Sequence, residues 1–521
     1  MDRRSRKLTP KISAGAAISC AVLVGALGGA PNAQAATPSA TYIVGAGAGL
    51  GATNLVTDIA EVGGSILQSL SAANAVEATL TASEVALLQA IPSITVTPNL
   101  AISLASATTT LTSSPAEVFA EQSGATKLWA AGDTGTGVNV AVLDTGITAL
   151  PDFGNRLLPG VDLSGGGNPT DDAYGHGTFV AGLIAGDGSS SDGQYTGEAP
   201  SAGLVPVKVA GASGNTDLAT VIAGIGWVIS HRVSDNIRVL NLSLGYQPIE
   251  STLVDPLDQA VQLAWNDGIV VVVAAGNDGP FNGTILSPGD DPSVITVGAL
   301  DDHGSATGSG NTMATFSSVG PTEPDGWFKP DLVASGQSVI SLRDPGSTVD
   351  VANPSARIGS ANFVGSGTSF STAIVSGAAA LVLADHPGDS PNEVKAALLG
   401  TTNPGPVGNP FVDGHGALDV AAAAGSTDLN LSQTSGAAPV ANAVGSLLST
   451  LGVTKPSAVQ LETTWSASNW NPANWQGLTT NPVPSTKPLA SGSAWSGSAW
   501  SGSAWSGSAW SGSAWSGSAW S

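Results

Sequence analysis

Cysteine, basic residues and charge of either sign are scarce in this chain of 521 residues. Its single cysteine, Cys20, lies near the N-terminus, so disulfide bonds cannot stabilise the rest of the chain. Charged residues make up only 11% of the sequence, and the formal net charge is −23. Nucleic acids and anionic membranes bind clustered lysine and arginine, and the shortage of both argues against either as a partner.

The first 35 residues have the pattern of a secretory signal peptide. A basic segment, MDRRSRKLTPK, precedes an apolar stretch rich in alanine and glycine, and AQA at 33–35 fits cleavage after Ala35. The competing interpretation is a membrane anchor, but the apolar stretch is short for one. We therefore predict a secreted, extracellular protein whose mature form contains no cysteine.

Residues 36–110 are predicted to form a small α+β domain. Period-two strand patterns and 3.6-period helix patterns follow one another in the order βαββαβ, which predicts a ferredoxin-like fold. A Ser/Thr-rich linker follows this domain. The patterns cover, in order, residues 40–46, 52–63, 65–80, 81–91 and 93–104.

Residues 125–424 show a different pattern, in which short Val- and Ile-rich runs alternate with helical stretches. Such continuous apolar runs are typical of parallel strands buried on both faces. The alternation predicts an α/β domain with a doubly wound, mostly parallel sheet. Five of the runs are VNVAVLD, GLVPVKVA, IRVLNLSLG, GIVVVVAAGN and VITVGAL.

Three polar side chains stand at special points of this pattern. Asp144 ends a buried strand, at the edge of the sheet where α/β proteins bind ligands. His176 begins a helix between two glycines, which let the backbone come close to its neighbours. Ser369 falls in the first turn of an apolar helix, where free N–H groups and the helix dipole face a developing anion. A turn aspartate, a structural histidine and a helix-capping serine are the alternatives.

A fourth candidate, Asn277, follows a buried strand in a glycine-flanked turn. Its amide can donate a hydrogen bond to a carbonyl oxygen that becomes negative, and losing such a donor costs roughly 3–4 kcal/mol of transition-state stabilisation. An ordinary turn asparagine is the alternative. Position alone does not select Ser369 either, because Ser366, Thr368 and Ser371 could equally cap the helix.

Together these motifs resemble those of the subtilisin-like serine proteases, the subtilase family. The resemblance rests on VAVLDTGI, GHGTFVAGLIAG, NLSLG, VVVAAGN and GTSFSTAIVSGAAAL, in the family's order Asp, His, Ser. It covers residues 125–424, and residues 41–104 resemble the family's inhibitory pro-domain. It implies a subtilisin-like peptidase domain with Ser369 as nucleophile, His176 as general base and acid, and Asp144 orienting the imidazole.

The same resemblance implies that Asn277 and the backbone N–H of Ser369 form the oxyanion hole. It also implies that NLSLG and AAGN pair with an extended substrate and wall its specificity pocket. The substrate-binding residues implied are Ser243, Leu244, Gly245, Ala275 and Gly276. Family members usually carry Pro and His where this chain has Ala373 and Ile374, a difference that we interpret as helix packing.

The function implied is that of a secreted serine endopeptidase, made as a zymogen, that hydrolyses protein or peptide substrates through an acyl-enzyme. The pro-domain would act as an intramolecular inhibitor and be cut off within 104–124. No cofactor is required for this chemistry; subtilases often bind structural calcium, but no loop has clear ligand spacing, so no metal-binding residues are assigned.

Two alternatives stay open. One is a secreted wall- or polymer-binding protein with an inactive protease-like scaffold. The other is an esterase, although GTSFS lacks the second glycine of the G-x-S-x-G elbow that esterases use.

Residues 428–521 are a linker and a Trp/Gly/Ser-rich tail. Six copies of SGSAW span 491–520, and nine of the 13 tryptophans lie in this tail. A period of five matches neither a helix nor a strand, and Gly/Ser spacing favours a flexible chain. Regular tryptophans suit stacking on cell-wall sugars or other polymers, and a low-complexity extension without a role is the alternative.

Overall fold

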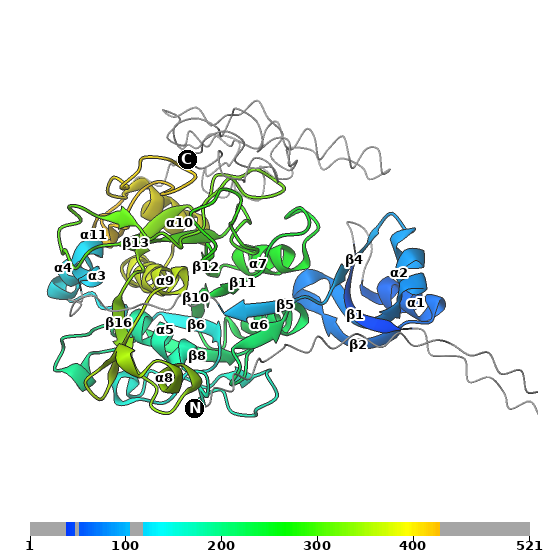
Figure 1. The fold of residues 1–521 in the computed structure, drawn as a ribbon, viewed down its shortest axis with the longest axis horizontal. Coiled ribbons are helices and arrows are strands. Elements are labelled where there is room, and N and C mark those ends of the chain that lie inside the picture. The colour runs from blue at the N-terminus through cyan, green and yellow to red at the C-terminus, as the bar shows by residue number, and fades with distance from the viewer. Residues whose placement is uncertain (1–37, 47–51, 105–117, 428–521) are drawn as a thin grey trace, which may run out of the picture. The chain divides into compact units, whose positions relative to one another are not determined.

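A computed structural model describes residues 38–46, 52–104 and 118–427 (Figure 1). The predicted signal peptide over 1–35 and the predicted tail over 428–521 lie outside these residues. The described chain contains four sheets, and the two largest are the centres of two domains with separate hydrophobic core clusters. The domain boundaries drawn from the sequence stay predictions.

The small N-terminal domain is a four-stranded antiparallel sheet with two helices packed against it and against each other. Its elements are β1 (Ser39–Ala46), α1 (Ala52–Val62), β2 (Ser65–Leu70), η1 (Ser71–Ala73), β3 (Ala75–Thr81), α2 (Ala82–Gln89) and β4 (Ile94–Pro98). The strand order β2-β3-β1-β4 confirms the predicted ferredoxin-like fold. A capping box between Thr81 and Glu84 starts α2.

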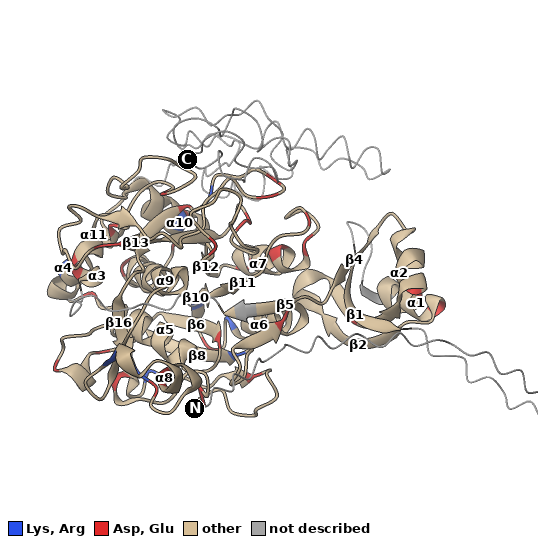
Figure 2. Ribbon diagram, in the orientation of Figure 1, with Lys and Arg blue, Asp and Glu red and all other residues tan. Residues whose placement is uncertain are grey.

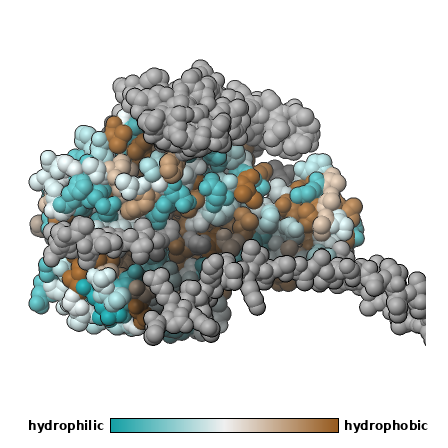
Figure 3. Space-filling view, in the orientation of Figure 1, coloured by the Kyte–Doolittle hydropathy of each residue, from teal (hydrophilic) through white to brown (hydrophobic). Residues whose placement is uncertain are grey.

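The core of the small domain is made of apolar side chains from β1, β3, β4 and both helices, among them Val44, Leu55 and Leu80. The domain is too small to bury all its apolar residues, and Leu67 and Leu87 are among those that stay exposed. Figure 3 shows apolar and polar residues mixed over the visible face of the molecule.

The stretch 93–104, predicted as one strand, forms two. After β4 ends at Pro98, a short turn leads into β5 (Ala101–Leu104), which leaves the small sheet. β5 is instead the central strand of a three-stranded sheet, between β9 (Asn215–Asp217) and β11 (Leu244–Gly245) of the large domain. The sequence could not show this, because both partners lie more than a hundred residues further along the chain.

The large domain is built on an eight-stranded sheet in the order β14-β13-β12-β10-β6-β8-β7, with β15 also paired to β13. Its strands are β6 (Asn139–Asp144), β7 (Val161–Asp162), β8 (Gly203–Lys208), β10 (Ile237–Leu242), β12 (Val270–Ala274), β13 (Ile295–Asp301), β14 (Thr312–Met313) and β15 (Leu332–Ser335). All pairings are parallel except that of β14. All five apolar runs picked out in the sequence form strands here, which confirms the predicted fold class.

Four helices pack against this sheet in two pairs. Helix α5 contacts α9, and α6 contacts α7. The helices are α3 (Phe119–Ser123), α4 (Ala125–Ala131), α5 (His176–Ala185), α6 (Leu218–His231), α7 (Pro256–Asn266), α8 (Thr348–Ala352), α9 (Thr368–Asp385), α10 (Pro391–Gly400) and α11 (Val420–Ala424). The short 3-10 helices are η2 (Pro151–Phe153), η3 (Ser189–Ser191) and η4 (Pro354–Ala356). A separate three-stranded antiparallel sheet contains β16 (Val339–Leu342), β17 (Arg357–Ile358) and β18 (Asn362–Gly365).

Side-chain caps explain where several of these helices begin. Asp217 accepts a hydrogen bond from the N–H of Thr220 at the start of α6. Asp255 caps α7, and a proline occupies the first helical position. Helix α9 is long and apolar enough to cross a membrane, but 89% of it is buried inside the domain, so it is the central core helix.

Acidic side chains are spread over both domains and basic ones are few, as Figure 2 shows. This distribution agrees with the 39 acids and 16 basic residues of the sequence. The described surface therefore offers no feature that favours a polyanionic partner over a neutral one.

Candidate active site

The first candidate residue, Asp144, is the last residue of β6 and is fully buried. Its carboxylate accepts hydrogen bonds from the N–H and the hydroxyl of Thr145. Gly146 then turns the chain with a φ of 110°, and a Cβ at this position would lie 2.8 Å from the carbonyl oxygen of Asp171. The carboxylate is thus fixed at the carboxyl edge of the sheet.

His176 is the first residue of α5, and the two glycines beside it have separate roles. Gly175 caps the helix with a φ of 102°, which L-residues rarely adopt. A Cβ on Gly177 would lie 2.2 Å from the carbonyl oxygen of Gly146 and 3.2 Å from Asp144. Glycine at 177 therefore lets the start of α5 come close enough for His176 and Asp144 to meet.

The imidazole of His176 is bound by Asp144 through one ring nitrogen. Nδ1 lies 2.9 Å from each carboxylate oxygen of Asp144, so the N–H at Nδ1 donates and Nε2 is left as the acceptor. Nε2 is buried and has no hydrogen-bond partner among the residues that the structure describes. Burial alone lowers the pKa of His176, but the charge and hydrogen bond of Asp144, with the charge of Asp172, outweigh it and raise this pKa above 6.5.

Asp172 is a site residue that the sequence did not single out. It is buried, and one oxygen accepts from the N–H of Gly175 at 2.8 Å. The other oxygen accepts from the N–H and the hydroxyl of Thr178 at 2.8 and 2.7 Å. Asp172 therefore holds the first turn of α5, from which His176 projects. An aspartate shortly before a helix start is the only signal for it in the sequence.

Ser369 lies in the first turn of α9, after the cap residue Gly367. Its hydroxyl donates to the carbonyl oxygen of Ser243 at 3.2 Å, and the hydroxyl of Ser243 donates to the carbonyl oxygen of Ser369 at 3.0 Å. The next residue, Phe370, has its ring centroid 5.7 Å from that of His176. The start of α9 is thus beside the imidazole, while the serine hydroxyl points to Ser243.

Asn277 follows β12, and its amide orientation is fixed by Thr368. The side-chain oxygen of Asn277 accepts from the N–H of Thr368 at 2.9 Å and from its hydroxyl at 3.0 Å. The Thr368 hydroxyl in turn accepts from the N–H of Gly276 at 3.2 Å. The amide nitrogen of Asn277 is left buried, with no partner among the described residues. Thr368, considered a cap from the sequence, is thus a positioning residue for Asn277.

The five predicted substrate-binding residues are all buried, and two of them pair with β5. Leu244 and Gly245 form β11, and Leu244 pairs with Leu104 of β5. A Cβ on Gly245 would lie 2.6 Å from the carbonyl oxygen of Ser287, so glycine permits close packing there. The remaining predicted residues, Ser243, Ala275 and Gly276, lie at the ends of β10 and β12. β5 already occupies the strand position beside Leu244 and Gly245.

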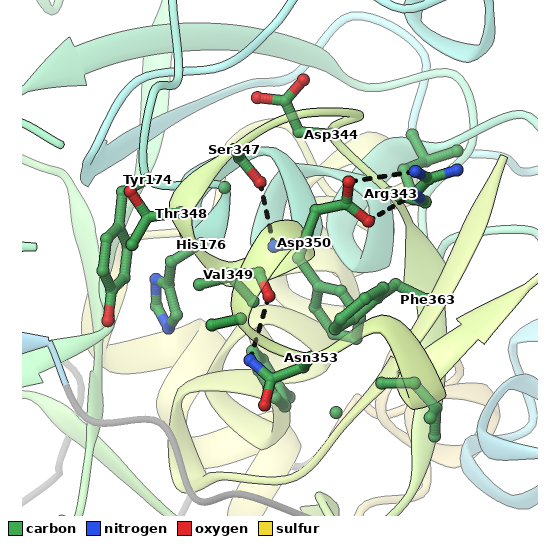
Figure 4. A pocket seen from close by; sticks show the side chains of 18 residues that line it. Tyr174, His176, Arg343, Asp344, Ser347, Thr348, Val349, Asp350, Asn353 and Phe363 are labelled. Atoms are coloured by element: carbon green, nitrogen blue, oxygen red, sulfur yellow. Dashed lines mark hydrogen bonds and ion pairs between the residues drawn. The ribbon is translucent and has the colours of Figure 1, made fainter.

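A cavity of about 170 Å³ opens beside His176 (Figure 4). Its walls come from the segment 342–365, which includes α8, and from residues 174–176 with Phe179 and Phe370. None of the five predicted substrate-binding residues lines it. This cavity could not be predicted from the sequence, because 342–365 has neither a helical nor an alternating pattern.

The described residues contain no group of three or more His, Cys, Asp or Glu side chains arranged to hold a metal ion. Five buried acids do gather near the start of α7 and before β13: Asp255, Asp258, Asp290, Asp291 and Asp325. No residues are assigned to a metal ion, and no step below depends on one.

The large domain thus brings together a buried carboxylate, a histidine bound to it and the start of the helix that carries Ser369. A family profile described as the subtilase family matches residues 135–416. The chain belongs to the subtilase family.

Three named proteases are similar to this chain in sequence. Serine protease AprX of Bacillus subtilis (strain 168) is 45% identical over 292 residues, which cover 55% of this chain and 66% of AprX. Subtilisin NAT of Bacillus subtilis subsp. natto is 37% identical over 56% of this chain and 67% of its own length. Subtilisin Savinase of Lederbergia lenta is 37% identical over 52% of this chain and 88% of its own length. The match thus covers just under two thirds of AprX.

Among solved structures, fervidolysin of Fervidobacterium pennivorans, a keratinolytic enzyme related to subtilisin, matches with a TM-score of 0.59. The match covers 75% of this chain and 61% of fervidolysin, at 23% identity. At this identity the likeness supports the shared fold alone.

Proposed function

We propose that this chain is a secreted serine endopeptidase that hydrolyses peptide bonds through an acyl-enzyme. The observation that carries the proposal is the state of His176: Nδ1 is bound by both oxygens of Asp144, and Nε2 is buried with no partner in the described part of the chain. A neutral imidazole held in this way can accept a proton only at Nε2. The start of α9, which carries Ser369, is the neighbouring source of a hydroxyl.

The first chemical step transfers the hydroxyl proton of Ser369 to Nε2 of His176 while the serine oxygen bonds to the scissile carbonyl carbon. Because this hydroxyl donates to Ser243 in the substrate-free arrangement, it must first turn toward the imidazole. His176 then gives the proton to the leaving nitrogen as the carbon–nitrogen bond breaks. Water repeats the two transfers and releases the acid.

The negative oxygen formed in the first step needs hydrogen-bond donors. Asn277 offers an amide nitrogen that is buried, unpartnered and held in one orientation by Thr368. The backbone N–H of Ser369 lies in the first turn of α9, where N–H groups have no partner within the helix. Donors fixed before the reaction need no reorganisation when the charge develops.

The N-terminal domain is proposed as the enzyme's own inhibitor. β5 fills the strand position between β9 and β11, so a substrate peptide cannot pair with these strands until β5 leaves. Additional bonds hold the domain: Asn99 accepts from the N–H of Ala219, and Thr97 donates to Glu250 at 2.7 Å. Activation would follow cleavage within 104–124 and release of this domain.

The test compares two serine variants in the first turns of the same helix. Ser369→Ala should abolish hydrolysis of casein and cause the uncut precursor to accumulate. Ser371→Ala is the matched control, since its hydroxyl bonds only to the carbonyls of Ala334 and Ser335 in the core. It should fold and cleave casein. Undiminished casein hydrolysis by purified Ser369→Ala would overturn the proposal.

Export and the role of the tail form separate parts of the proposal. N-terminal sequencing of protein from the culture medium should find the mature chain starting after residue 104. Contact of the tail with cell wall or polysaccharide rests on its regular tryptophans alone. Deleting 428–521 should remove binding to insoluble polysaccharide and leave casein hydrolysis intact.

A further inference from the structure

Strand β11 forms one side of the strand position that β5 fills, and it consists of two residues only, Leu244 and Gly245. Among the strands that the structure describes, β11 pairs with β5 alone (Figure 1). Release of the N-terminal domain would remove β5 and leave β11 without this partner. A substrate can then pair with β11 at low cost only if other contacts hold the strand in place.

The direction of β5 shows which part of a substrate would pair with β11. The two strands are antiparallel, and Leu104, the last residue of β5, lies opposite Leu244. The chain of β5 therefore runs toward Ser243, whose carbonyl oxygen accepts the hydroxyl of Ser369. A peptide bound in the same direction reaches Ser369 at its C-terminal end, so β11 would pair with residues that precede the scissile bond.

Tyr246, the residue that follows β11, is bound to Ser287 through the main chain. The N–H of Tyr246 donates to the carbonyl oxygen of Ser287 at 3.0 Å, and the N–H of Ser287 donates to the carbonyl oxygen of Tyr246 at 2.9 Å. The N–H of Leu286 donates to the carbonyl oxygen of Ala275 at 3.0 Å. These bonds join the end of β11 to the turn that carries Asn277.

The side chain of Tyr246 is bound by Asp255, which is fully buried. One carboxylate oxygen, Oδ1, accepts from the N–H groups of Leu257 and Asp258 at 2.8 and 3.3 Å, in the first turn of α7. The other oxygen, Oδ2, accepts from the hydroxyl of Tyr246 and, at 3.4 Å, from the hydroxyl of Ser287. Asp255 thus joins the start of α7 to both members of the Tyr246–Ser287 bridge.

The phenol of Tyr246 keeps its proton and is the donor in this contact. Tyr246 is buried, and burial, followed by the charge of Asp255, raises the pKa of its hydroxyl. If the hydroxyl were removed, the buried carboxyl group of Asp255 would lose a donor, and leaving such an oxygen poorly satisfied is unfavourable. The aromatic ring would then be held by packing alone, and the end of β11 would be less firmly fixed.

We propose that Tyr246 and Asp255 are positioning residues for β11, which keep this strand in the geometry that a peptide substrate needs once β5 has left. The inference rests on the proposed peptidase function and adds two residues that act through the strand. It also defines the substrates that depend on them: peptides with several residues before the scissile bond, long enough to pair with β11. A substrate with a single acyl residue does not depend on them.

The test compares Tyr246→Phe with wild type, both matured from the full chain and with active sites counted by fluorophosphonate titration. The long substrate is a p-nitroanilide with four acyl residues, and the short one is an ester with one. Tyr246→Phe keeps the ring and removes only the hydroxyl. For the anilide, KM should rise about 5- to 10-fold with kcat within about twofold of wild type. Both constants for the ester should stay within about twofold.

Tyr195→Phe is the matched control. It makes the same chemical change at a partly buried tyrosine that packs against the core of the large domain, in the segment between η3 and β8. It should keep the wild-type constants for both substrates.

Asp255→Ser tests the other member of the pair. Serine can still cap α7, but its single side-chain oxygen cannot hold both the first turn of that helix and the phenol. KM for the anilide should rise as in Tyr246→Phe. The double variant should be no more than about twofold worse than the weaker single variant, because both changes break the same link.

The outcomes separate the two proposals. Failure of the wild-type enzyme to cleave the anilide would overturn the proposed peptidase function. An unchanged KM in Tyr246→Phe, equal losses on the anilide and the ester, or losses that multiply in the double variant would overturn the positioning role alone.

Discussion

Both carboxylate oxygens of Asp144 lie 2.9 Å from Nδ1 of His176. This contact fixes the imidazole tautomer and leaves Nε2, on the far side of the ring, as the only place for a proton to go. Neither residue could make the contact without the glycine at 177, because a side chain there would collide with the carbonyl of Gly146.

Replacing Asp144 with asparagine should keep the fold and nearly abolish catalysis. Asparagine has the same shape, but its amide can donate to Nδ1 and so favours the tautomer with a proton on Nε2. We expect kcat to fall by about 10⁴. Circular dichroism and a melting curve would check the fold. A loss of less than tenfold would show that the Asp144–His176 contact does not support the reaction.

The activity should rise with pH, with a midpoint above 6.5. His176 acts as a base only when neutral, and its pKa is raised in the folded protein. The same shift has the opposite effect on stability: protonated His176 stabilises the fold below pH 6.5, and this contribution is lost as pH rises through the folded pKa. The acid limb of kcat/KM checks the prediction, and a midpoint below 6.5 would contradict it.

Removing the hydroxyl of Thr368 should lower kcat with little change in KM. Thr368→Val keeps the shape and the N–H, but Asn277 loses one of the two bonds that orient its amide. Because one such bond contributes about 1 kcal/mol, kcat should fall roughly 5- to 10-fold. Thr368→Ser, which restores the hydroxyl, should recover most of the rate. Equal losses in valine and serine variants would point to packing instead.

Asp258→Asn should stabilise the protein more at pH 8 than at pH 4. Burial, followed by the charge of Asp290, raises the pKa of Asp258 well above its usual value, and neither of its oxygens has a partner. The folded protein therefore keeps a proton that the unfolded chain releases above about pH 4, so this group makes stability fall as pH rises.

Melting temperatures of wild type and variant at both pH values would test this, with an expected gain of a few °C at pH 8. Asp385→Asn, at a side chain that is 54% exposed, is the control and should change little at either pH. A loss of stability at pH 8 in Asp258→Asn would mean that the carboxylate is charged and has a counter-ion.

The sequence predicted those parts of the molecule that depend on local pattern. Val-rich runs gave the strands of the main sheet, because β-branched residues buried on both faces leave a continuous apolar pattern. Asp144, His176 and Ser369 stood out because each lies where a strand ends or a helix begins.

What the sequence could not show depends on contacts between distant segments. The pairing of β5 with β9 and β11 joins residues more than a hundred positions apart. The bonds from Thr368 to Asn277 and from Asp172 to the first turn of α5 look like ordinary helix caps in the sequence. The cavity at α8 is lined mainly by a segment without helical or strand periodicity. Its existence therefore shows only in the folded structure.

The central claim is that Ser369 becomes a nucleophile by giving its proton to His176. The most direct measurement is labelling of the purified, active protein with a fluorophosphonate, which reacts with activated serines, followed by mass mapping of the modified peptide. The account predicts one label, on Ser369, and at least a hundredfold slower labelling in His176→Ala. A folded protein that takes no label at Ser369, or takes it equally fast without the imidazole, would contradict it.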